Sequence, residues 1–198
     1  MRSRIMTSKL QSVLDEIDEI NRQDQNQEIV EGIAQPKELL YGQRMSECLL
    51  TYWPGASELL QIAVRAQHVK RWHIARKEYP MGKAGYYAWR TALGVFHAET
   101  AHELMLSKGY SEQEANQTAS MLKKERLKSN PDTQTLEDVA CLVFLMHYFG
   151  PFAEKHSDEK IISIVQKTWK KMSDQAKDIA LSLTLPPHLG KLVAQALS

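Results

Sequence analysis

The sequence has only two cysteines, Cys48 and Cys141, among its 198 residues. One pair of thiols can neither hold a structural zinc ion by itself nor build a disulfide scaffold, so we expect both side chains to be reduced and packed. The chain also lacks an excess of charge of either sign, since its formal net charge is +1. No global field therefore favours nucleic acid, a membrane surface or an acidic partner, and any anion site must come from a local cluster.

Long apolar runs are missing as well. The longest unbroken one, Val139–Met146, is far shorter than the roughly 18 residues that a membrane span needs. No apolar run follows the basic residues at the start, and Asp15 and Glu16 come early, so we expect neither a secretory signal nor a transit peptide. The sequence therefore predicts a cytoplasmic protein with no membrane partner.

The remaining composition is that of a packed globule, with 43% hydrophobic and 25% charged residues. We find no alternating strand pattern of useful length, no repeat and no low-complexity tract. Apolar residues instead recur at the spacing of three and four that is typical of amphipathic helices. We therefore expect an all-α, single-domain bundle of about eight to nine helices over residues 1–198.

Capping and breaking residues divide this expected domain into parts. An N-terminal helix and a polar loop occupy residues 1–28, a core occupies 36–150, and C-terminal helices occupy 157–198. The predicted helices run over about 10–20, 36–52, 57–76 and 86–108, and further helices begin near Ser111, Asp132, Ser157, Ser173 and Pro187. Ser111 and Glu114 form a capping box, and the apolar segment Val139–Met146 should lie at the buried centre.

Several catalytic motifs can be excluded. His97 and His102 are five residues apart, which is about 140° around a helix, whereas the zinc-protease motif needs a spacing of four. Glu99 and His102 form half of a di-iron carboxylate signature, but the chain has no second Glu-x-x-His. It also has no nucleophile elbow and no phosphate-binding glycine loop.

Three polar residues occupy positions where packing alone favours apolar ones. His68 and His97 lie on helices rich in core residues, and Asp138 stands at the start of the most apolar segment. Because a buried carboxylate needs a cation, a metal or several donors, two imidazoles and this carboxylate could form a site for a divalent metal. A capping box over Thr135–Asp138 would also account for the aspartate, and helical histidines are more often hydrogen-bonded core residues.

The order of these residues resembles the HD-domain superfamily, which is all-helical and typically consists of metal-dependent phosphohydrolases. The amino-acid sequence is more closely similar to a smaller family, known as domain of unknown function 4202. The resembling stretches are Glu38–Met45, Arg65–Trp72, Gly85–Arg90, Phe96–Glu99, Leu136–Phe144 and Lys167–Ser173. The HD resemblance implies a metal site made by His68, His97 and Asp138, for which manganese, cobalt, nickel, iron or magnesium would be candidates.

The chain departs from the HD pattern at the residue after the second histidine, where Ala98 stands in place of an aspartate. Glu99 is no simple replacement, because residues two apart on a helix point about 200° away from each other. Lys124 stands where many HD enzymes have a further histidine. We therefore expect one metal ion or none, and no two-metal mechanism.

Basic residues near the histidines suggest an anionic ligand. Arg65, His68 and Arg71 would share one face of the helix predicted over 57–76, and Arg90 shares a face with His97. We therefore predict Arg65, Arg90 and Lys124 as phosphate ligands. The lysines around Lys124 could equally form a solvated outer face.

These features support three hypotheses. The first is an HD-like protein that binds a phosphorylated small molecule, such as a nucleotide, and could hydrolyse it with one metal ion. The second is a non-catalytic binding or scaffold protein that retains the HD-like fold without metal chemistry, as Ala98 suggests. The third is RNA binding through the lysine clusters, which the net charge of +1 favours least.

Overall fold

The computed structural model describes residues 8–198, and about 72% of these residues lie in helices. Within these residues there are ten α-helices and a small two-stranded sheet. The predicted helical class is therefore confirmed, with the hairpin as an addition. The chain forms two compact units, one that ends at Ser129 and one that spans Asn130–Ser198.

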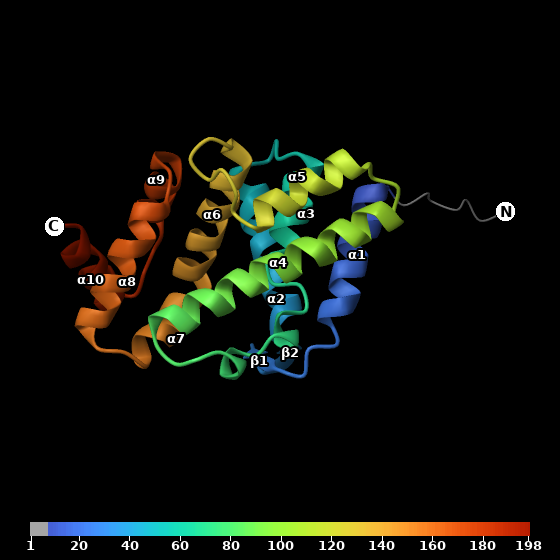
Figure 1. Ribbon diagram of the computed structural model, residues 1–198. Coiled ribbons are helices and arrows are strands. Elements are labelled where there is room, and N and C mark those ends of the chain that lie inside the picture. The colour runs from blue at the N-terminus through green and yellow to red at the C-terminus, as the bar shows by residue number, and fades with distance from the viewer. Residues whose placement is uncertain (1–7) are drawn as a thin grey trace. The chain divides into compact units, whose positions relative to one another are not determined.

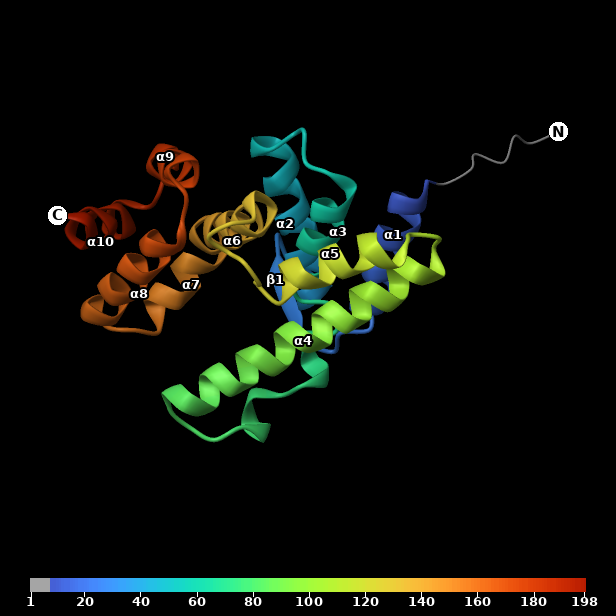
Figure 2. The same cartoon turned by 45° about the horizontal axis from the view of Figure 1, so that its top comes forward.

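Five α-helices, a hairpin and two short 3-10 turns make up the first unit, and Figures 1 and 2 show how the labelled elements are arranged. Its elements are α1 (Lys9–Asn21), β1 (Gln27–Val30), β2 (Ile33–Pro36), α2 (Lys37–Tyr52), α3 (Glu58–Ala66), the turns Arg71–His73 and Arg76–Glu78, α4 (Lys83–Ser107) and α5 (Glu112–Leu122). The long helix α4 packs along α5, and α3 packs against α1, α2 and α5. Their apolar faces enclose a core that includes Ile17, Met45, Ile62 and Met105, all fully buried.

Serine caps start several of these helices, as the sequence predicts. The Ser57 side chain accepts a hydrogen bond from the backbone N–H of Leu60. Ser111 and Glu114 form the predicted capping box, in which each side chain bonds the backbone of the other residue. Such caps satisfy backbone N–H groups that have no partner within the helix.

The hairpin was not expected from the sequence, which suggested an irregular polar loop over 21–28. Strands β1 and β2 pair antiparallel, with Val30 opposite Ile33. The two residues between them, Glu31 and Gly32, both have positive φ, 51° and 79°. Such turns usually carry Asn-Gly or Asp-Gly, so a glutamate at the first position and strands of only four residues leave no recognisable signal.

Helix α3 is much shorter than the predicted helix over 57–76, because it ends at Ala66. The chain then turns through Lys70, which adopts a left-handed backbone conformation with φ 51°. The side chain of Asn21, at the end of α1, accepts a hydrogen bond from the Lys70 backbone N–H at 2.9 Å. This contact is remote in sequence, so helical periodicity could not reveal it. Because α3 ends at Ala66, Arg65 does not share a helical face with His68 and Arg71.

The second unit is helical throughout. It contains α6 (Pro131–Val143), a π-helical segment (Phe144–Tyr148), α7 (Phe149–Glu154), α8 (Asp158–Lys171), α9 (Asp174–Ser182) and α10 (Pro187–Leu197). The side chains of Ser157 and Ser173 cap α8 and α9, as predicted. The wide π turn precedes Pro151, whose ring would clash with the carbonyl of His147 in a regular helix.

The helical run Pro131–Glu154 is long and apolar enough to span a membrane by length and composition, with a mean hydropathy of 1.3 in its best window. Half of that window is buried inside the structure. Leu136, Val139 and Leu142 are fully buried, and the last two belong to the apolar segment for which the sequence predicts burial. One side of this helix therefore belongs to the core.

Candidate functional site

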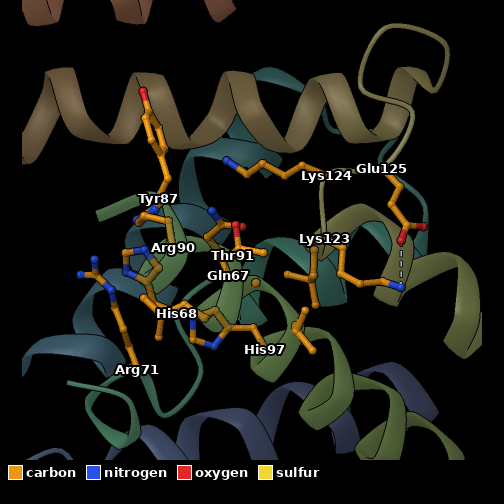
Figure 3. Close-up of a pocket in the computed structure, with 14 residues that line it drawn as sticks. Gln67, His68, Arg71, Tyr87, Arg90, Thr91, His97, Lys123, Lys124 and Glu125 are labelled. Atoms are coloured by element: carbon orange, nitrogen blue, oxygen red, sulfur yellow. Dashed lines mark ion pairs between the residues drawn. The ribbon is translucent and has the colours of Figure 1, made fainter. Parts of the chain in front are cut away.

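The first unit contains a pocket of about 440 Å³ (Figure 3). Its walls come from three segments: the turn after α3, the N-terminal half of α4 and the turn after α5. The lining residues are Gln67, His68, Arg71, Tyr87, Arg90, Thr91, Leu93, Gly94, Val95, His97, Leu122, Lys123, Lys124 and Glu125. The structure thus brings together four of the residues predicted for the site, His68, His97, Arg90 and Lys124.

His68 is held on one side by helix α2. Its Nδ1 lies 3.1 Å from Oε2 of Glu38, and its ring stacks on Tyr41 with centroids 3.8 Å apart and planes 11° from parallel. Burial lowers the pKa of His68 well below its usual range, and the nearby charges of Arg71 and Arg90 lower it further. The imidazole is therefore neutral at pH 7 and carries a single ring proton.

His97 lies deeper and has a well-defined protonation pattern. Its Nδ1 lies 2.8 Å from the carbonyl oxygen of Val69, which can only accept, so Nδ1 donates. Burial lowers the pKa of His97 to about 3 despite this bond, with further lowering by Arg71 and Arg90. The Nε2 atom of the neutral ring is buried and has no hydrogen-bond partner among residues 8–198. The His68 and His97 ring centroids are 6.2 Å apart.

Glu38 belongs to this site, although sequence reasoning missed its role. Burial raises its pKa to about 7; Arg71 opposes this rise and Asp24 adds to it. In the sequence, Glu38 looks like an ordinary acidic residue in the first turn of a helix. Only its contact with His68, thirty residues away, distinguishes it from such a residue.

The pocket carries several cations. The Arg71 guanidinium lies 5.0 Å from the centre of the Trp89 ring, and burial lowers the pKa of Arg71. Its Nε is buried without a hydrogen-bond partner in the described part of the chain. Figure 3 shows Arg71 and Arg90 on one side of the pocket and the side chain of Lys124 along another.

Two neighbouring lysines after α5 also line the pocket. Lys123 forms an ion pair with Glu125 at 2.9 Å. Lys124 has a left-handed backbone with φ 58°, and its side chain lies along the pocket (Figure 3). The lining contains four Arg or Lys residues and one Glu, so it has more positive than negative residues, which suits an anion.

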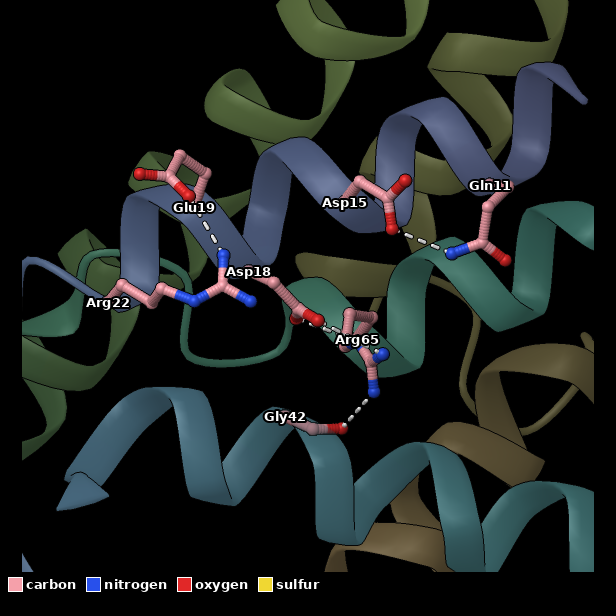
Figure 4. A network of polar contacts seen from close by, with 7 residues as sticks. All are labelled: Gln11, Asp15, Asp18, Glu19, Arg22, Gly42 and Arg65. Carbon is pink, nitrogen blue, oxygen red and sulfur yellow. Dashed lines mark hydrogen bonds and ion pairs between the residues drawn. The ribbon is translucent and has the colours of Figure 1, made fainter. Parts of the chain in front are cut away.

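Arg65, predicted as a phosphate ligand, does not line this pocket. Its Nε lies 3.0 Å from Asp18 Oδ1, and its Nη1 donates to the carbonyl oxygen of Gly42 at 3.3 Å (Figure 4). These bonds connect helices α1, α2 and α3. A Cβ at Gly42 would lie 3.2 Å from the Arg65 carbonyl oxygen, so the close approach of α2 and α3 favours glycine there. The role of Arg65 as a phosphate ligand stays a prediction, and its contacts in the structure are those of a residue that packs three helices together.

Asp138 lies in the second unit, on α6, and is almost completely buried. Its Oδ1 accepts hydrogen bonds from the Ser173 backbone N–H at 2.8 Å and from Gln134 Nε2 at 2.9 Å, and its Oδ2 accepts from the Ser173 hydroxyl. Because Asn130 caps α6, Asp138 is an interior residue of that helix, and the capping box considered over 135–138 is wrong. The carboxylate is satisfied within its own unit.

Two further predictions concern the metal site. Helix α4 continues without a break past His97, and Glu99 is exposed on another side of it, as the angular argument indicated. Among residues 8–198, no three His, Cys, Asp or Glu side chains are grouped so that they could hold one ion. The set His68, His97 and Asp138 therefore stays a prediction, of which the structure places the two histidines in one pocket.

Comparison with known proteins gives a family but no activity. Neither a curated protein nor a solved structure matches this chain. Residues 11–193 match the family described as a domain of unknown function (DUF4202), and this range includes nearly the whole of both units. The chain therefore belongs to the DUF4202 family.

Proposed function

We propose that this pocket binds a phosphorylated small molecule. The observation that carries the proposal is the concentration of positive charge from Arg71, Arg90 and Lys124 around a cavity of about 440 Å³, a size that suits a small ligand or nucleotide. Arginine side chains present several N–H donors in a planar fork that matches phosphate oxygens. A phosphate dianion would compensate the charges that the pocket walls leave in excess.

The two imidazoles extend this proposal to a metal-assisted phosphohydrolase of the HD type. With Nδ1 of His97 donating to Val69 and Nδ1 of His68 next to Glu38, both rings can offer Nε2 as an electron-pair donor. Neutral imidazoles whose other nitrogen bonds a carbonyl or carboxylate are typical metal ligands. A divalent ion bound there would lower the pKa of a bound water for attack on phosphorus.

Asp138 could act as a metal ligand only by losing hydrogen bonds that it makes in the structure. To serve as the third ligand, its carboxylate would have to give up its bonds to Ser173 and Gln134. In our proposal His68 and His97 are the protein ligands, Arg71 and Arg90 hold the phosphate oxygens, and Lys124 adds a further positive charge. The ligand's own phosphate oxygens could supply the other coordination positions.

Titration calorimetry with a panel of phosphate monoesters, including nucleoside monophosphates, tests the binding. Each titration is repeated with and without manganese, cobalt or nickel. Arg90→Met should weaken binding by roughly 10- to 100-fold, because a hydrogen bond to a charged group contributes about 1.5–3 kcal/mol. Arg22→Met is the matched control, since Arg22 pairs with Glu19 on the exposed side of α1, and it should leave the affinity unchanged. No heat with any monoester, with or without metal, would refute the proposal.

A second candidate, phosphate binding without metal chemistry, is favoured by the engaged carboxylate of Asp138 and by Ala98 in the position of an HD aspartate. It predicts that added metal changes neither phosphate affinity nor turnover. It also predicts that His97→Ala lowers stability while ligand affinity changes only a fewfold. Elemental analysis of dialysed protein, together with the metal series above, separates the two candidates.

A further inference from the structure

Helix α2 contacts the His68 ring through two residues on one of its faces. Glu38 and Tyr41 are three residues apart, so they lie next to each other on the helix surface. The carboxylate of Glu38 reaches the edge of the ring at Nδ1, 3.1 Å away. Tyr41 covers the face of the ring, with centroids 3.8 Å apart. Together they contact both the edge and the face of one imidazole.

Glu38 is itself held firmly. Its backbone N–H donates to Oδ2 of Asp24 at 3.1 Å, and Asp24 is buried at 2% exposure. The other oxygen of Asp24 accepts from the backbone N–H of Asn26 at 2.9 Å. These bonds tie the start of α2 to the segment before the hairpin, and the Glu38 side chain is only 14% exposed. Its carboxylate therefore meets His68 from a fixed position.

We propose that Glu38 is a positioning residue that keeps the single ring proton of His68 on Nδ1 and so leaves Nε2 as an acceptor for a ligand in the pocket. The carbonyl of Val69 does the same for His97. The pocket then presents two imidazole acceptors beside arginines and a lysine. The consequence for ligand binding rests on the proposed function, whereas the position of the ring proton does not.

The two contacts from α2 have different consequences. Tyr41 orients the plane of the ring by stacking, but a stacked phenol ring offers no acceptor in that plane. Only the carboxylate can decide which nitrogen keeps the proton. Without an acceptor at Nδ1, a neutral His68 would populate the form protonated on Nε2 and would present a donor to the ligand. The residue at position 38 therefore determines which ring nitrogen of His68 donates a hydrogen bond and which accepts one.

Long-range proton–nitrogen correlation spectra of ¹⁵N-labelled protein, recorded without metal or ligand well above the pKa of about 7 of Glu38, where its side chain is a carboxylate, test this inference. His68→Gln assigns the His68 signals by their loss. In the native protein we expect the His68 proton on Nδ1, as for His97. Glu38→Leu should give a substantial Nε2-protonated population at His68 while the His97 pattern stays unchanged, which also reports an intact fold.

Two matched variants separate positioning from packing. Glu38→Gln retains a side-chain oxygen that can accept from Nδ1, so it should keep the native proton position. Tyr41→Leu removes the stack but keeps the carboxylate, so it should keep it as well. A native His68 protonated on Nε2, or an equal shift in Glu38→Leu and Tyr41→Leu, would overturn the inference. A protein that binds no phosphate would overturn the proposed function alone.

Discussion

The turn that carries His68 and Arg71 depends on Asn21, and replacing this residue should destabilise the first unit. Asn21 is buried at 1% exposure and accepts the Lys70 backbone N–H at 2.9 Å. Lys70 has the left-handed conformation, which costs a residue with a side chain about 1–2 kcal/mol. The hydrogen bond that the Lys70 N–H donates to Asn21 offsets this cost and holds the turn that follows α3.

Asn21→Ala leaves the Lys70 N–H without its acceptor. An unsatisfied buried donor costs about 1–3 kcal/mol, so we expect the free energy of unfolding to fall by that amount. For a chain of this size, each kcal/mol lowers the midpoint of thermal unfolding by roughly 2–4 °C. Urea denaturation followed by circular dichroism measures the change, and an unaltered m-value would show that the extent of unfolding is the same.

Lys70→Gly serves as the control for this prediction. It keeps the N–H donor and relieves the left-handed strain, so the free energy of unfolding should stay level or rise by up to about 1 kcal/mol. The reasoning would be refuted if Asn21→Ala changed stability by less than about 0.5 kcal/mol, the range of ordinary surface substitutions. A Lys70→Gly variant as unstable as Asn21→Ala would refute it equally.

Three other predictions follow from buried groups. Burial raises the pKa of Glu38 from 4.5 to about 7, so the folded state binds the Glu38 proton more tightly than the unfolded state does. This proton binding stabilises the folded state fully below pH 4.5, and the stabilisation is lost as the pH rises through 7. In urea titrations, the free energy of unfolding of the native protein relative to Glu38→Gln should therefore fall by up to about 3 kcal/mol between about pH 4.5 and 8. Burial raises the pKa of Cys48 to about 12, so in a Cys141→Ser variant iodoacetamide at pH 8 should label this thiol only after unfolding, and rapid labelling of the folded protein would contradict this. Ser173→Ala removes a hydrogen-bond donor to the buried Asp138 and the side-chain cap of α9. The free energy of unfolding, measured by thermal unfolding, should fall by about 2–3 kcal/mol. A fall of less than about 0.5 kcal/mol would show that the carboxylate finds other partners.

The sequence alone determined most of the helices, because their signals are local. Caps at Ser57, Ser111 and Ser173 and the spacing of apolar residues act within a few positions, so helix starts could be predicted from neighbouring residues. The same local argument identified His68 and His97 as polar residues in apolar surroundings. The resemblance to DUF4202 was also read directly from the sequence and is confirmed over residues 11–193.

Tertiary structure decided which of these residues act together. Helix α3 ends at Ala66, and the Lys70 N–H in the turn after it donates to Asn21, so Arg65 meets Asp18 whereas Arg71 enters the pocket. Glu38 became a site residue only because α2 brings it beside His68. Each of these contacts joins segments far apart in the chain, and helical periodicity describes only which residues share a face, not what that face will meet.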